Sequence, residues 1–175
     1  MKTKAQVWVE TAVYTLIGLT IITILLAVVT PQIEKIKDKS IIEQTVMALN
    51  DINTKIEEAE QAPGSIRIIN LKIAKGSINI DSPTNEITYT LENTKLELSE
   101  PGEEIQEGNI KIKTEEQGSK FKITLTMSYP NLQLTYNNQE APKTLQAGTQ
   151  PYKINIENIG DQLPSKPIHL DFSLI

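Results

Sequence analysis

The sequence predicts an α+β protein in which one long N-terminal helix is followed by an antiparallel β-sandwich-like head. Three patterns predict this fold class. Residues 11–33 carry no charged side chain, and apolar residues then recur at helical spacing as far as residue 59. After Gly64 the sequence changes to alternating apolar and polar residues, which is typical of antiparallel strands with one buried face.

The uncharged stretch predicts a helix that crosses a membrane. Its centre, residues 13–29, holds eleven Val, Leu or Ile residues, which together favour insertion by about 3 to 7 kcal/mol. A run of this length is enough to span a hydrocarbon layer of about 30 Å. The stretch also contains threonines whose hydroxyls we expect to donate to the carbonyl four residues earlier. These are Thr11, Thr15, Thr20, Thr23 and Thr30.

Two other interpretations of this stretch are disfavoured. A buried helix of a soluble protein would need apolar segments around it, and no other part of the chain could enclose so uniformly apolar a helix. A cleavable secretory signal would need a small-x-small site after the apolar run, and residues 25–31 offer no Ala-x-Ala site but a proline. We therefore expect the helix to be retained.

Beyond Pro31 the spacing predicts an amphipathic helix. Pro31 itself should kink or break the helix, because proline lacks the amide hydrogen and clashes with the preceding turn. The helix should end by Pro63-Gly64. Its apolar stripe should pack on the head, with packing against neighbouring stalks as the alternative. The stripe is Ile33, Ile36, Ile42, Val46, Leu49, Ile52, Ile56 and Ala59, and the opposite face carries Glu34, Lys37, Asp38, Glu43, Asp51, Lys55 and Glu58.

The alternating segments after Gly64 predict nine strands in an antiparallel sandwich or wrapped sheet packed on the upper helix. In the first of them the apolar phase slips at Ile68-Ile69, which suggests a β-bulge. The nine segments are 66–73, 78–80, 87–91, 96–98, 110–112, 121–127, 132–136, 152–156 and 168–174.

The sequence contains no pattern typical of an enzyme, a cofactor site or a metal site. It has no cysteine and one histidine, His169, which we expect to lie at an edge or in solvent. The acidic segment 100–107 is expected to be a solvated loop, with calcium binding as the alternative. Four lysines at 111, 113, 120 and 122 should share one sheet face, where they protect an exposed edge or, alternatively, attract a polyanion. The net charge of −5 argues against a nucleic-acid partner.

A short motif precedes the apolar run. Residues 5–10 read Ala-Gln-Val-Trp-Val-Glu after a leader bearing Lys2 and Lys4. This arrangement resembles the class III signal of archaeal type IV pilin-like proteins, although Trp8 stands where that family prefers serine. The resemblance implies that a prepilin peptidase cuts after Ala5 and makes Gln6 the mature N-terminus. Together with the patterns described above, it gives a leader at 1–5, a transmembrane and stalk helix at 6–62 with a break near Pro31, and a β-rich extracellular head at 63–175.

The resemblance also implies a function. The chain would be a structural subunit of a type IV pilus-like surface filament, inserted in the membrane as a precursor and assembled with copies of itself by the pilus machinery. Glu10 would pair with the freed amine of a neighbouring subunit, whereas simple capping of the helix start is the alternative. The alternative function is a monomeric membrane-anchored extracellular binding module, or a minor pseudopilin.

Overall fold

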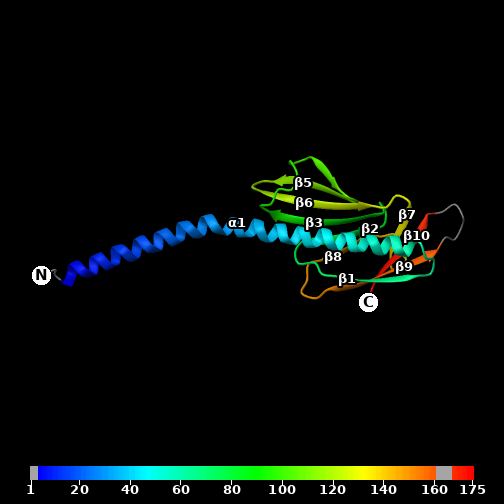
Figure 1. Cartoon of the computed structure of the whole chain (residues 1–175), viewed down its shortest axis with the longest axis horizontal. Helices are drawn as coiled ribbons and strands as arrows, with labels where there is room; N and C mark the ends of the chain where they lie inside the picture. The colour runs from blue at the N-terminus through cyan, green and yellow to red at the C-terminus, as the bar shows by residue number, and fades with distance from the viewer. Residues whose placement is uncertain (1–3, 161–166) are drawn as a thin grey trace. The chain divides into compact units, whose positions relative to one another are not determined.

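The computed structural model describes residues 4–160 and 167–175, and for residues 4–6 only the backbone. One helix, α1 (Lys4–Glu60), precedes all the strands, so the α+β class is confirmed (Figure 1). The strands are β1 (Ile66–Leu71), β2 (Ser77–Asp81), β3 (Glu86–Thr94), β4 (Glu104–Glu107), β5 (Ile110–Gln117), β6 (Lys120–Ser128), β7 (Leu132–Tyr136), β8 (Lys143–Gln146), β9 (Tyr152–Gly160) and β10 (Ile168–Leu174).

The chain divides into two compact units, residues 1–37 and residues 38–175. The second unit, called the head below, therefore contains the last part of α1 as well as all the strands. The amphipathic part of α1 thus belongs to the same compact unit as the sheets.

The helix continues through Pro31, so it does not end there, and the predicted kink stays a prediction. Pro31 lies inside α1, and the backbone is helical on both sides of it. A proline in a helix removes one backbone hydrogen bond and disfavours the conformation of the residue before it, at a cost of about 3 kcal/mol. Long helical segments on either side each form many hydrogen bonds of their own, and here they accommodate that cost.

The strands of the head form two sheets that pack as a sandwich. Sheet A has the order β1-β9-β10-β7, and sheet B has the order β4-β5-β6-β3-β2-β8. Every pairing is antiparallel except that of β10 with β7, which is parallel. The prediction of an antiparallel head is therefore confirmed apart from this one pair.

A single core joins the sheets to the helix. Both sheets and α1 contribute to it, and Figure 1 shows the last part of α1 running along the strands. The predicted stripe is confirmed at Ile42, Leu49, Ile52, Ile56 and Ala59, which are at most 4% exposed. Its first two members do not join the core, since Ile33 and Ile36 are 45% and 69% exposed.

Three details of the strand prediction are wrong. The segment 96–98 is not a strand, whereas β4 and β8 were not predicted. The register between β1 and β9 is unbroken, so there is no bulge at Ile68-Ile69. Instead Ile66 and Ile68 lie on the exposed face of β1, and Ile69 begins the buried alternation on the other face. The phase slip in the sequence therefore marks two exposed isoleucines, not an extra residue.

Candidate functional site

The apolar part of α1 exposes its side chains on all sides. Its large apolar side chains between Val7 and Val29 are between 45% and 81% exposed, and Trp8 is the most exposed. None of the apolar window is buried within the described residues. A helix that is apolar all round is stable only when another apolar phase surrounds it. This helix is long and apolar enough to cross a membrane, which is compatible with a membrane anchor or a signal sequence.

The threonines in this part of α1 satisfy their own hydroxyls. Each donates to the carbonyl four residues earlier at 2.7 to 2.9 Å, as the sequence predicts. The hydroxyls are therefore hydrogen-bonded within the helix and add little polarity to its surface. The five threonines are consistent with an apolar environment on every side.

The residues of the signal-like motif lie at the beginning of α1. Ala5 and Gln6 are within the helix, and their side chains are outside the described part of the structure. Because α1 begins at Lys4, Glu10 lies in its second turn. Removal of residues 1–5 would make Glu10 the fifth residue of the chain. Its side chain is half-buried and is the one charged group between Gln6 and Ile33.

A buried carboxylate fixes the start of the head on α1. Asp38 is 5% exposed, although the sequence places it on the charged, solvent-facing side of the helix. Lys75 Nζ donates to Asp38 Oδ1 at 2.6 Å, and Thr94 Oγ1 donates to Asp38 Oδ2 at 2.6 Å. Both carboxylate oxygens therefore have partners from the sheet region, as a buried charge requires. Asp38 precedes Ile42 by four residues, and this spacing is the signal that could have placed it on the buried stripe.

Local backbone geometry brings these partners to Asp38. The register of β3 shifts between Leu91 and Thr94, and Asn93 between them has a positive φ of 56°. Such an irregularity turns a side chain that would otherwise point away, and here Thr94 reaches the interior. The backbone of Lys75 is fixed by a hydrogen bond, which the Tyr89 hydroxyl donates to the Lys75 carbonyl oxygen at 2.8 Å. Burial raises the pKa of Tyr89 to about 12, so this hydroxyl remains a donor at neutral pH.

Next to Lys75, the turn requires a glycine. Gly76 has a φ of 79°, and a Cβ there would collide with the Thr90 carbonyl oxygen. Only glycine combines this left-handed conformation with such a close approach of two backbones.

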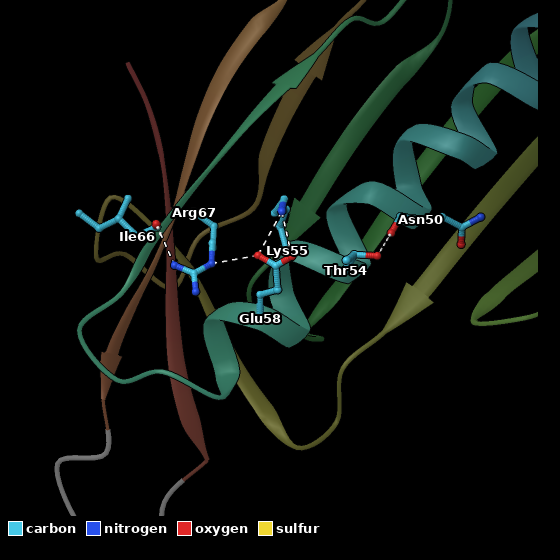
Figure 2. Close-up of polar contacts among 6 residues, drawn as sticks. All are labelled: Asn50, Thr54, Lys55, Glu58, Ile66 and Arg67. Atoms are coloured by element: carbon cyan, nitrogen blue, oxygen red, sulfur yellow. Dashed lines mark hydrogen bonds and ion pairs between the residues drawn. The ribbon is translucent and has the colours of Figure 1, made fainter.

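The end of α1 is held by β9 and β1. Asn158 is fully buried, and its Nδ2 donates to the Ala59 carbonyl at 2.7 Å. This amide thus satisfies a carbonyl that the end of the helix would leave without a partner. Figure 2 shows Glu58 between Lys55 and Arg67, whose nitrogens lie 2.9 and 3.1 Å from its oxygens. The hydrogen bond from Lys55 is the main cause that lowers the pKa of Glu58 below its ordinary value.

Of the two places predicted for the single histidine, an edge or solvent, the edge is excluded. His169 lies on β10, an inner strand of sheet A, and is half-buried. Thr135 Oγ1 lies 2.8 Å from His169 Nε2 and 2.6 Å from Asp171 Oδ1. An ionised carboxylate can only accept, so the Thr135 hydroxyl gives its proton to Asp171 and accepts from His169. This orientation is the reverse of a nucleophile that a histidine activates.

The four lysines predicted to share a face do so by register, but most of them have acidic partners. Lys111 lies 3.3 Å from Glu104, and Glu115 lies 2.9 Å from Lys113 and 3.7 Å from Lys122. The hydrogen bond with Glu115 raises the pKa of Lys113, and the same contact lowers that of Glu115. A face with such pairing attracts a polyanion poorly.

The segment predicted to be an acidic loop forms β4 over Glu104–Glu107. The described residues hold no group of three or more His, Cys, Asp or Glu that could bind a metal ion.

Comparison of the chain with protein-family models, with curated proteins and with solved structures gave no match.

Proposed function

We propose that this chain is the structural subunit of a type IV pilus-like surface filament, in which the apolar helices bundle as a core and the β-rich heads form the surface. One observation supports this most directly. The helix from Val7 to Val29 exposes apolar side chains all round and is followed by a compact head. Bundled helices of identical subunits would cover that surface once the subunit has left the membrane.

Glu10 supports a filament over a simple anchor. A membrane anchor needs no carboxylate, and one drawn toward the bilayer centre costs up to about 3 kcal/mol. In a bundle the same carboxylate would meet a cation from a neighbour. The simplest cation is the α-amine that a prepilin peptidase would free by cutting between Ala5 and Gln6. Removal of Lys2 and Lys4 with the leader would change the net charge from −5 to −7.

Electron microscopy of cell-surface material, combined with mass spectrometry of the subunit N-terminus, tests the proposal. The chain is expressed with a prepilin peptidase and the assembly machinery. We expect thin filaments composed of this chain, with Gln6 as the first residue. An intact Met1 on assembled material, or a start beyond Pro31, would contradict the maturation step. A membrane-bound monomer without filaments would favour the alternative, a membrane-anchored extracellular binding module.

A further inference from the structure

A groove of about 320 Å³ lies in the head where the last turns of α1 pass sheet B. Glu57 and Glu60 of α1 line it together with Lys111 of β5. The buried Met127 and the half-buried Tyr129 also line it, and the Tyr129 hydroxyl lies 3.1 Å from Asn53 Oδ1. The groove thus combines carboxylates on the helix side with an apolar and aromatic lining.

The two groove carboxylates are not neutralised by the head. The last turn of α1 contains no basic residue, although the negative end of the helix dipole favours cations there. Glu58 has Lys55 and Arg67 as partners (Figure 2), but it does not line the groove. No ion pair joins Glu57 or Glu60 to any described residue, and Glu57 accepts only a hydrogen bond from Asn53 at 2.7 Å.

Among the described residues that line the groove, the one cation is already engaged. Lys111 Nζ lies 3.3 Å from Glu104, outside the groove lining. A ligand that matches the remaining surface has a positive end and an aliphatic stem, because the stem can cover the apolar lining while the charge meets the carboxylates. A lysine side chain has this chemistry.

The chain carries such lysines in residues 35–39, which read Lys-Ile-Lys-Asp-Lys. Lys35 and Lys39 are exposed and four residues apart on α1, and Glu57 and Glu60 are three residues apart. Both spacings bring side chains to about 5–6 Å from each other on one helix face. Lys39 has only a long contact of 4.0 Å with Glu43, and both side chains are more than 60% exposed, so this contact can be exchanged at little cost.

We infer that this groove receives Lys35 and Lys39 from the α1 of a second copy of the chain. The inference rests on the proposed filament function. Lys39 and Glu60 of one chain are separated by about 32 Å along α1, at about 1.5 Å per residue, so they cannot pair within the chain. The lysines and the groove occupy different places on each copy. Pairing them is therefore a head-to-tail contact, which continues from copy to copy into an open polymer.

Disulfide cross-linking tests this contact directly, because the natural chain has no cysteine. The full-length chain carrying Lys39→Cys and Glu60→Cys is assembled on cells and then oxidised. We expect a ladder of disulfide-linked oligomers on a non-reducing gel, which collapses to monomer on reduction. The matched control is Lys39→Cys with Glu116→Cys, which makes the same charge change at an exposed residue of β5 outside the groove. An equal ladder from the control, or none from the test pair, overturns the inference.

Charge reversal gives an independent measurement. Glu57→Lys with Glu60→Lys, and Lys35→Glu with Lys39→Glu, each place like charges opposite one another and should lower filament number by about tenfold or more. The combined fourfold variant restores opposite charges and should recover filaments at equal amounts of subunit in the membrane. Loss in both reversals without recovery in the combination overturns the inference. Filaments without a ladder would refute this contact alone, whereas a ladder without filaments would refute the proposed function alone.

Discussion

The two parts of α1 share a continuous helical backbone but differ in what their surfaces contact. Residues 7–30 expose apolar side chains in every direction, and their threonine hydroxyls bond only to the helix itself. Residues 38–60 bury one face in the head, and that face is fixed by polar partners at Asp38 and near Glu60. The chain itself thus covers the apolar face of the second part, whereas it leaves the apolar side chains of the first part exposed.

The largest expected effect comes from reversing the one charge in the apolar part. In a dry helix bundle, Glu10→Lys would place two positive groups together, and an unpaired buried charge costs about 3–5 kcal/mol per subunit. We expect precursor processing and membrane levels to remain normal while filaments disappear. The measurement is the number of filaments per cell, divided by the amount of subunit in the membrane fraction. The control is Glu116→Lys, which makes the same charge change on the exposed surface of the head. Normal filament numbers in Glu10→Lys would rule out the charge pairing.

The next effect compares two neighbouring residues of the second part of α1. Leu49 is fully buried and Met47 is 64% exposed. Leu49→Ala should lower the free energy of unfolding by about 2–5 kcal/mol, because it removes core contacts and leaves a cavity. Met47→Ala should change it by no more than about 0.5 kcal/mol. Denaturant unfolding of the detergent-solubilised chain measures both. Similar values for the two variants would show that this part of α1 does not pack in the head core.

Asp38 should have a smaller effect. Asp38→Ala leaves Thr94 without its buried acceptor, which should cost about 1–3 kcal/mol. Lys75 contributes less, because its side chain is 41% exposed and can be solvated. Asp38→Asn retains one acceptor and should cost less than alanine. Asp51→Ala is the control, since Asp51 is exposed on the same helix. Equal stability of the alanine variants at 38 and 51 would contradict a stabilising role for Asp38.

The smallest effect concerns pH and Glu58. Because its folded pKa lies below the ordinary value of 4.5, Glu58 contributes stability above about pH 4.5 and loses this contribution as the pH falls through the lowered pKa. Glu58→Gln should therefore reduce the melting temperature slightly near pH 7 and have no effect at the lowest pH. Thermal unfolding of both proteins across this range measures the difference. A difference that grows as the pH falls would contradict the sign of this linkage.

The sequence predicts those elements in which several apolar residues share one face. The stripe of α1 and strands such as β6, with three buried apolar residues at alternate positions, are of this kind. Strands β4 and β8 lie at the two ends of sheet B. Strand β4 buries no apolar residue and β8 buries one, so neither shows an alternation that could be detected in the sequence. The segment 96–98 alternates without being a strand, because the Thr114 hydroxyl accepts from the backbone of Leu98 and Ser99 in place of a neighbouring strand.

The polar contacts of the head were harder to predict than its core. The sequence places Asp38 on the solvent-facing side of the helix and gives no sign that Asn158 is buried, because their partners lie 37 to 99 residues away along the chain. Only the fold brings these groups together. By contrast, the threonine hydrogen bonds of the apolar part were predicted correctly, since donor and acceptor are four residues apart within one helix.

The pairing of β1 with β9 has a consequence for the order in which the protein forms. Among the described strands, β1 has only β9 as a neighbour in sheet A, and β9 is synthesised about 80 residues later. Strand β9 also supplies the amide that caps α1. Closing so long a loop is slow, so sheet A is expected to form late in folding. The apolar helix, in contrast, can enter a membrane as soon as it leaves the ribosome. The head would then fold while tethered at the membrane surface. During that time its strand edges are unpaired, and only the spacing between anchored chains would prevent them from pairing with the strand edges of other chains.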